Sequence, residues 1–160
     1  MKKTMFLRIL IGYTAVIALL ALAVTLFAPP LMRKHHIAER ATSLERMALL
    51  LEGQVAPFLM TGNTGGDLEG LVTSYGRRTG TRITVIDAAG VVLADSEKEP
   101  RDMENHLFRP EIQASLRGEK QMSIRASSTL KTDMMYMSIP VAVDGQVKGA
   151  LRLSYFMKDF

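Results

Sequence analysis

Residues 81–96 read "TRITVIDAAGVVLADS", and this stretch decides the fold class of the chain. Apolar and polar side chains alternate before and after residues 87–90, as they do in β-strands with one buried face. Asp87 suits the first position of a type I turn, and Gly90 suits the left-handed position that closes it. The stretch therefore predicts two antiparallel strands joined by a tight turn.

Three further alternating runs follow towards the C-terminus. Asp144-Gly145, between the last two of them, is the strongest two-residue hairpin signal. Pro140 lies inside a run and lacks a backbone donor, so it indicates an edge or a bulge at that point. Together, the runs predict an α+β domain with a five-stranded, mostly antiparallel sheet over residues 81–156.

Two short helices are expected on either side of the first hairpin. Asp67 is predicted to cap the first helix and Gly80 to end it, because carboxylates suit N-caps and glycine suits the left-handed residue after a helix. The second helix is predicted from Pro110 to Gly118. It lies in a mixed polar crossover, residues 97–118, that joins the second strand to the third.

A long helix is predicted over residues 31–58, ahead of the sheet. Its apolar side chains recur at alternating spacings of four and three, and Pro57 with the following "TGNTGG" stretch ends it. Such a seam either joins two copies in a homodimer or packs on the domain's own sheet, and one helix is wide enough for both contacts. The seam consists of Ile37, Ala41, Leu44, Ala48, Leu51, Val55 and Phe58.

Residues 9–28 form an uncharged, mostly apolar run of 20, which at about 1.5 Å per residue spans a bilayer core of ~30 Å. A cleaved signal peptide is the rival interpretation, but the apolar run continues past the small residues that resemble a cleavage site. We predict a single transmembrane helix that Pro29-Pro30 interrupts at the membrane surface, with the next helix either continuous with the membrane span or hinged to it there. Its short basic N-terminus favours residues 1–8 in the cytoplasm and residues 31–160 outside it.

The composition excludes several classes of function. Apart from the three basic residues ahead of the apolar run, the chain has 17 Lys and Arg against 16 Asp and Glu, so no nucleic-acid partner is expected. The absence of cysteine excludes disulfides, thiolate metal sites and cysteine nucleophiles. Hydrolase triads, HExxH motifs and nucleotide-binding glycine loops are also missing, so we expect neither catalysis nor a cofactor.

Histidine and methionine do not predict a metal site. His35 and His36 lie where the helix leaves the membrane, and a metal there would need further ligands. Met135 and Met137 fall on the apolar face of a predicted strand, where ordinary core filling explains them. No metal is therefore expected.

The polar face of the predicted sheet is the best place to look for a ligand. If the crossover folds over this face, it encloses a basic pocket for a small anion, with His106 and Arg109 on its lid. In the alternative, which a two-layer domain favours, the charges are solvated and His106 pins the crossover by a hydrogen bond. Alternation places the following residues on this face: Arg82, Arg125, Tyr136, Lys148 and Arg152.

Three stretches resemble a known family: "RRTGTRITVIDAAGVVLADSEKEP" at 77–100, "MENHLFRPEI" at 103–112 and "DMMYMSIPV" at 133–141. They are similar to the extracytoplasmic PAS-like sensor region, of PDC or Cache type, of membrane two-component histidine kinases, closest to those of the phosphate regulon. The resemblance implies the order helix, short helix, two strands, helical crossover and three strands. It also implies a second membrane helix and a kinase core, which these 160 residues do not contain.

We therefore expect the N-terminal part of a receptor kinase, or a stand-alone relic of one. Its localisation would be the bacterial inner membrane, and its partners a second copy and either a small anion or a membrane or periplasmic protein. Two alternatives remain open: the input domain of a chemoreceptor or diguanylate cyclase, and a self-contained membrane-tethered binding module. Catalysis by the chain itself is the least expected of these functions.

Overall fold

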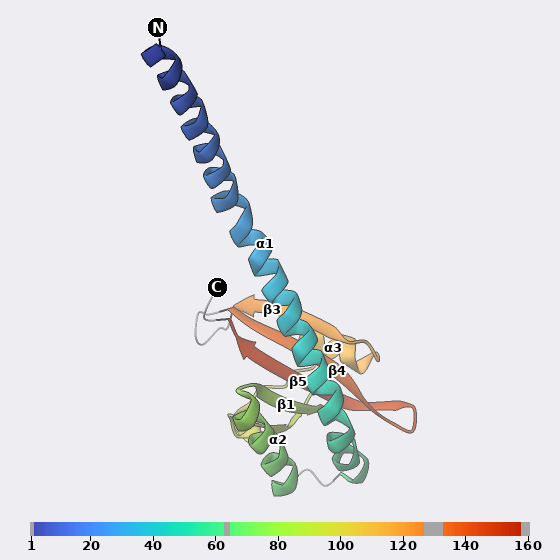
Figure 1. Ribbon diagram of the computed structural model, residues 1–160. Helices are drawn as coiled ribbons and strands as arrows, with labels where there is room; N and C mark the ends of the chain where they lie inside the picture. Colours follow the sequence, from blue (N-terminus) through green and yellow to red (C-terminus); the bar gives the residue numbers. More distant parts are fainter. Residues whose placement is uncertain (1, 63–64, 127–132, 158–160) are drawn as a thin grey trace. The chain divides into compact units, whose positions relative to one another are not determined.

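The computed structural model describes residues 2–62, 65–126 and 133–157. Residues 1–39 form one unit and residues 40–160 a second, compact one. Figure 1 shows the helices and strands. In chain order they are α1 (Lys2–Thr61), α2 (Gly66–Thr79), β1 (Arg82–Asp87), β2 (Val92–Asp95), the short 3-10 helix η1 (Pro100–Asp102), α3 (Pro110–Leu116), β3 (Gln121–Ala126), β4 (Asp133–Val143) and β5 (Gln146–Phe156).

In the first unit, α1 contains a stretch that is long and apolar enough to cross a membrane. This stretch, Leu10–Ala28, has 19 residues, and none of it is buried. The predicted interruption at Pro29-Pro30 is wrong, because α1 continues through both prolines. Each proline removes one backbone donor, and the uninterrupted turns on both sides keep the helix continuous across that loss.

The second unit is built on a single antiparallel sheet with the strand order β2-β1-β5-β4-β3. The first predicted hairpin is confirmed: the Asp87 carboxylate accepts hydrogen bonds from the backbone N–H of Ala89 and of Val91, both at 2.8 Å. Gly90 is left-handed there, with φ of 81°. The second hairpin is confirmed too, since Asp144 and Gly145 both have positive φ.

Pro140 occupies the kind of position that its chemistry requires. β3 pairs with β4 only as far as Ser138, so Pro140 lies beyond the ladder on that side and needs no donor there. A bulge follows directly, between Val141 and Ala142. The sequence-based expectation of an edge or a bulge is therefore confirmed on both counts.

Of the two predicted short helices, only α2 differs from the prediction at its N-terminus. Gly65, not Asp67, is the N-cap of α2, and Asp67 lies in the first turn, where a carboxylate complements the helix dipole. Gly80 ends α2 in the left-handed conformation, as expected. In α3 the expected Pro110 is the first helical residue.

One face of the sheet carries the apolar core, beneath α2 and the part of α1 that lies in the second unit (Figure 1). Four residues of the predicted seam of α1 are buried here: Leu44, Ala48, Leu51 and Val55. Ile37, Ala41 and Phe58 are partly buried. The seam thus packs in the chain's own core, and a dimer contact through α1 stays a prediction. The strands contribute Ile83, Val85, Met135, Ile139, Leu151 and Leu153.

Candidate functional site

The opposite face of the sheet gathers polar residues from all five strands. The registers pair Thr84 of β1 with Arg152 of β5, and Arg152 in turn with Ser138 of β4. Because paired residues share a face, alternation brings the whole polar set together. The set comprises Arg82 and Thr84 of β1, Asp95 of β2, Arg125 of β3, Tyr136 and Ser138 of β4, and Arg152 and Ser154 of β5.

The crossover covers this face. α3 packs on β3, β4 and β5. Its Ile112 joins Ile86 and Ala150 in a small apolar cluster, and its Ser115 hydroxyl donates to the Ser138 hydroxyl at 2.7 Å. The expectation of a solvated face is therefore wrong. A third layer forms because α3 offers both an apolar residue for the apolar part of the face and polar groups for the rest.

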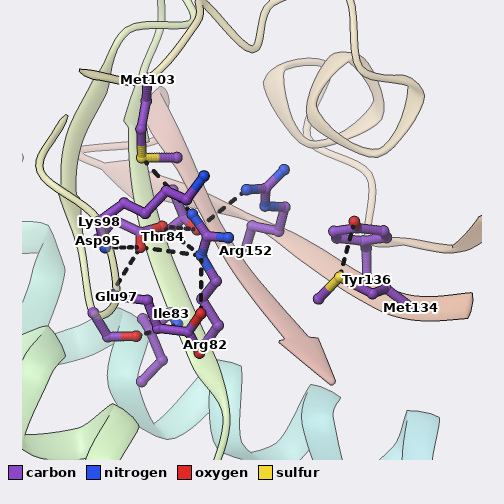
Figure 2. A network of polar contacts seen from close by, with 11 residues as sticks. Arg82, Ile83, Thr84, Asp95, Glu97, Lys98, Met103, Met134, Tyr136 and Arg152 are labelled. Atoms are coloured by element: carbon purple, nitrogen blue, oxygen red, sulfur yellow. Dashed lines mark hydrogen bonds and ion pairs between the residues drawn. The ribbon is translucent and has the colours of Figure 1, made fainter. Parts of the chain in front are cut away.

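Asp95 anchors the first of two buried charge groups (Figure 2). Arg82 Nε donates to both carboxylate oxygens of Asp95, at 3.0 and 3.1 Å, and the Thr84 hydroxyl donates to Oδ2 at 2.8 Å. The backbone N–H groups of Glu97 and Lys98 donate to Oδ1. Four donors make five contacts with its two oxygens, so the Asp95 carboxylate is saturated.

Glu111 of α3 anchors the second charge group and is completely buried. Its Oε1 accepts a hydrogen bond from Arg125 Nη2 at 2.8 Å and lies 3.6 Å from Arg152 Nη1. The Tyr136 ring lies beneath both guanidinium groups, with its centroid 4.3 Å from Arg125 Cζ and 5.3 Å from Arg152 Cζ. Three predicted ligand residues, Arg125, Tyr136 and Arg152, therefore meet around one carboxylate.

Arg152 is the least well neutralised member of the cluster. Only 4% of it is exposed, yet its contacts to Glu111 and to the Thr84 hydroxyl are 3.6 and 3.3 Å long. Charge-assisted hydrogen bonds are typically about 2.7–2.9 Å long. Burial lowers the pKa of Arg152 to about 10, although the Glu111 carboxylate opposes this shift.

Three buried polar atoms of this face have no hydrogen-bond partner among the described residues: Arg152 Nε, Glu111 Oε2 and Ser154 Oγ. Buried polar atoms in proteins are almost always paired with protein, water or a bound molecule. The face therefore has an unused donor, an unused acceptor and a hydroxyl that can serve as either.

His106 fastens the crossover to the first hairpin. Its backbone N–H donates to the Gly90 carbonyl at 2.8 Å, and its ring Nδ1 lies 2.7 Å from the Glu104 carbonyl oxygen. Asn105 adds a hydrogen bond to the Ala89 carbonyl. Burial, and next the positive charge of Arg152, lower the pKa of His106, so the ring is neutral at pH 7. These contacts hold the crossover against the first hairpin, and contact of His106 with a ligand stays a prediction.

Arg109 and Lys148 lie outside the buried cluster. The Arg109 side chain is 42% exposed and 3.7 Å from the exposed Glu104 carboxylate, while its backbone provides the N-cap of α3. Lys148 is exposed and donates to Gln146. Among the described residues, no three His, Asp or Glu side chains converge as metal ligands.

Sequence reasoning missed the two carboxylates that organise this face. Asp95 and Glu111 belong to the motifs "ADS" and "RPEI", but neither has a periodic pattern that assigns it to the polar face. Arginines on a strand face that the crossover could cover were the available signal, since buried guanidinium groups require anionic partners.

No family model matches the sequence, and no curated protein matches it. Solved structures do match. The sensor domain of the Vibrio cholerae histidine kinase DctB aligns with a TM-score of 0.59 at 15% identity, over 81% of this chain and 57% of that one. The ligand-binding domain of the Campylobacter jejuni chemoreceptor Tlp3, solved with 4-methylisoleucine, gives 0.64 and 18%, over 79% and 55%.

A third match is the ligand-binding domain of the Pseudomonas aeruginosa amino acid chemoreceptor PctC with GABA, at a TM-score of 0.55 and 13% identity, over 72% of this chain and 56% of that one. The chain thus spans little more than half the length of these sensor domains. The matches do not support the narrower resemblance to phosphate-regulon kinases. Identities this low show the fold alone, and the chain has the helices and five-stranded antiparallel sheet of a PDC/Cache-like sensor domain.

Proposed function

We propose that the chain is the signal-sensing, membrane-anchored N-terminal segment of a two-component sensor histidine kinase. One observation carries the proposal: a single helix, α1, contains both the apolar stretch Leu10–Ala28 and side chains buried in the core of a sensor-type domain. A helix shared in this way connects a change inside the domain directly to a membrane segment. The finer assignment, to a phosphate-regulon kinase, rests only on the resemblance of residues 77–100, 103–112 and 133–141.

The proposed input site is the face of the sheet beneath α3. A small molecule that enters there meets groups from the crossover and from β5, which is the last strand. If the molecule binds one arrangement of these elements more tightly than another, it shifts the population towards the first. α1 packs on the other side of the same sheet and would pass the shift to the membrane.

The proposed topology follows the charge pattern of the sequence. Residues 1–8 are cytoplasmic, residues 9–28 cross the bacterial inner membrane, and residues 31–160 lie outside the cytoplasm.

We also propose a homodimer. Three exposed apolar residues on the outer side of α1 support it: Leu49, Leu50 and Met60.

The second candidate function is the input domain of a chemoreceptor or a diguanylate cyclase. It is supported by the chemoreceptor domains that share the fold, one of them solved with 4-methylisoleucine and one with GABA. A stand-alone membrane-tethered binding module is the third candidate. All three have the same sensing face and differ in what the domain controls.

Two experiments test the proposal. Alkaline phosphatase, which is active only outside the cytoplasm, is fused after residue 160. We expect an active fusion, and an inactive one contradicts the topology.

Sequencing the gene beyond codon 160 separates the candidates: a second apolar run and a phospho-acceptor histidine helix support the kinase, whereas a methyl-accepting coiled coil or a GGDEF motif supports the second function.

A further inference from the structure

We infer that the face beneath α3 is an oxyanion-binding site. The chain's own Glu111 carboxylate occupies the position of the ligand, and an incoming carboxylate or phosphate must displace it. This inference rests on the proposed sensing function and names the ligand chemistry of its input site. The group that attracts the ligand is Arg152, and the group that competes with the ligand is Glu111.

The charges of the face are unbalanced towards the positive. Three arginines lie there with two buried carboxylates, and Arg82 is matched by the saturated Asp95. Glu111 is left to serve both Arg125 and Arg152. Arg82 also lies 3.9 Å from a second carboxylate, that of the exposed Glu97. Arg125 and Arg152 each make one carboxylate contact among the described residues, and both contacts are to Glu111. A buried cation without its own anion is costly, and an oxyanion is the partner that this group lacks.

The pairing between Arg152 and Glu111 is also geometrically poor. Asp95 engages its arginine through both carboxylate oxygens, whereas Glu111 reaches Arg152 through one oxygen at 3.6 Å. Within the part of the chain that the structure describes, Glu111 Oε2 and Arg152 Nε have no hydrogen-bond partner, although both are buried. An external oxyanion is free of the α3 backbone and can therefore satisfy Arg152 through two donors, as guanidinium groups favour.

The neighbours of Arg152 fit an oxyanion rather than a cation. Ser154 lies two residues along β5 on the same face, and its hydroxyl, which has no partner among residues 2–62, 65–126 and 133–157, can donate to a second ligand oxygen. The Tyr136 ring holds the guanidinium groups of Arg125 and Arg152. The Arg125 side chain is 26% exposed, so the cluster reaches solvent on that side.

Displacement of Glu111 links binding to the crossover. Glu111 lies in the first turn of α3, so a ligand that takes its place acts on the helix that covers the site. Ile112 and Ser115 hold α3 to the sheet by separate contacts, through the apolar cluster and through Ser138. Binding can therefore shift the start of α3 without releasing the whole helix.

The test measures anion binding by the full chain in lipid nanodiscs, using calorimetry at constant ionic strength. The probes are inorganic phosphate and succinate, with chloride as the background anion. Glu111→Gln removes the competing charge and keeps the side-chain shape, so we expect at least one probe to bind ~10-fold more tightly than to the unaltered chain. Adding Arg152→Met should abolish this gain. The control is Glu119→Gln, which removes an exposed carboxylate paired with Arg117 and should change nothing.

The two probes distinguish the sources of the anion. A gain for phosphate alone assigns a phosphate ligand, and a gain for succinate alone assigns a carboxylate; either supports the inference. Equal binding by the unaltered chain and Glu111→Gln overturns it, as does a gain that survives Arg152→Met. If Glu111→Gln fails to fold, Glu111→Asp replaces it, because the shorter side chain withdraws the carboxylate from Arg152 by one methylene. We expect this variant also to bind phosphate or succinate more tightly than the unaltered chain, because its carboxylate competes less well.

Failure of the inference and failure of the proposed function give different results. If anion binding is unchanged while the phosphatase fusion is active and a second apolar run follows residue 160, Glu111 is not a competitor and the sensing function stands. If the fusion is inactive, the proposed function fails whatever the calorimetry shows.

Discussion

The two faces of the sheet are made by alternate residues of the same strands, yet they are buried in opposite ways. Under α1 and α2, the buried side chains are aliphatic or methionine, such as Leu51 and Leu153. Under α3, arginines and carboxylates are buried beside a small apolar cluster. Both faces bury large side chains, so burial alone does not distinguish a structural face from a functional one.

The difference lies in what each face needs from its neighbours. Aliphatic side chains are stabilised by removal from water and accept any well-shaped apolar neighbour. Charged groups lose hydration on burial and require particular partners at particular distances. The α1 face therefore supplies most of the stability, whereas the α3 face depends on its contacts and changes when one partner is altered.

The largest effect is expected from Asp95→Ala on the polar face. The substitution leaves Arg82 and the Thr84 hydroxyl without their shared acceptor, together with two backbone donors. Removing one partner of a buried ion pair costs about 3–5 kcal/mol. Urea denaturation should show this loss in the free energy of unfolding. A loss below about 1 kcal/mol would mean that these charges are hydrated, contrary to the closed face described here.

A smaller loss is expected from Leu51→Ala on the apolar face. Leu51 is buried in the seam of α1. Its truncation should lower the free energy of unfolding by about 3 kcal/mol through lost burial and the cavity left behind. The matched control is Leu50→Ala, next along the helix and 78% exposed, which should cost far less. Similar losses at the two positions would contradict the packing of the seam on the sheet.

The difference between the faces also explains what the sequence predicted and what it did not. Alternation and the Asp87–Gly90 turn predict the strands, because these signals are local. The spacing of the α1 seam predicts its buried face for the same reason. The charge partners escape prediction because Glu111 and Arg152 meet only through the register of β5 and the docking of α3, which are tertiary properties. For this reason, too, the expected solvated face proved to be covered.

The pH dependence of stability tests the position of His106 within the polar face. Its pKa in the folded chain is below the ordinary 6.5, because of burial and then Arg152, with Arg109 and Arg82 adding in the same direction. Neutral His106 therefore contributes stability above pH 6.5 that is lost as pH falls towards the folded-state pKa. Chemical denaturation of the unaltered chain should show falling stability below pH 6.5, and His106→Gln should show a smaller fall. Parallel pH curves would contradict the proximity of His106 to the arginines.

The smallest effect is expected from Arg109→Ala, at the outer edge of the same crossover. Arg109 caps α3 with its backbone, which alanine preserves, and its side chain makes a half-exposed ion pair with Glu104 at 3.7 Å. Such pairs contribute about 0.5 kcal/mol or less, and the contribution falls with added salt. The free energy of unfolding should therefore barely change, and the change should vanish at high ionic strength. A loss of unfolding free energy that is independent of salt and as large as that of Asp95→Ala would contradict this description. It would mean that Arg109 belongs to the buried charge cluster and is not at the solvent-exposed edge of the face.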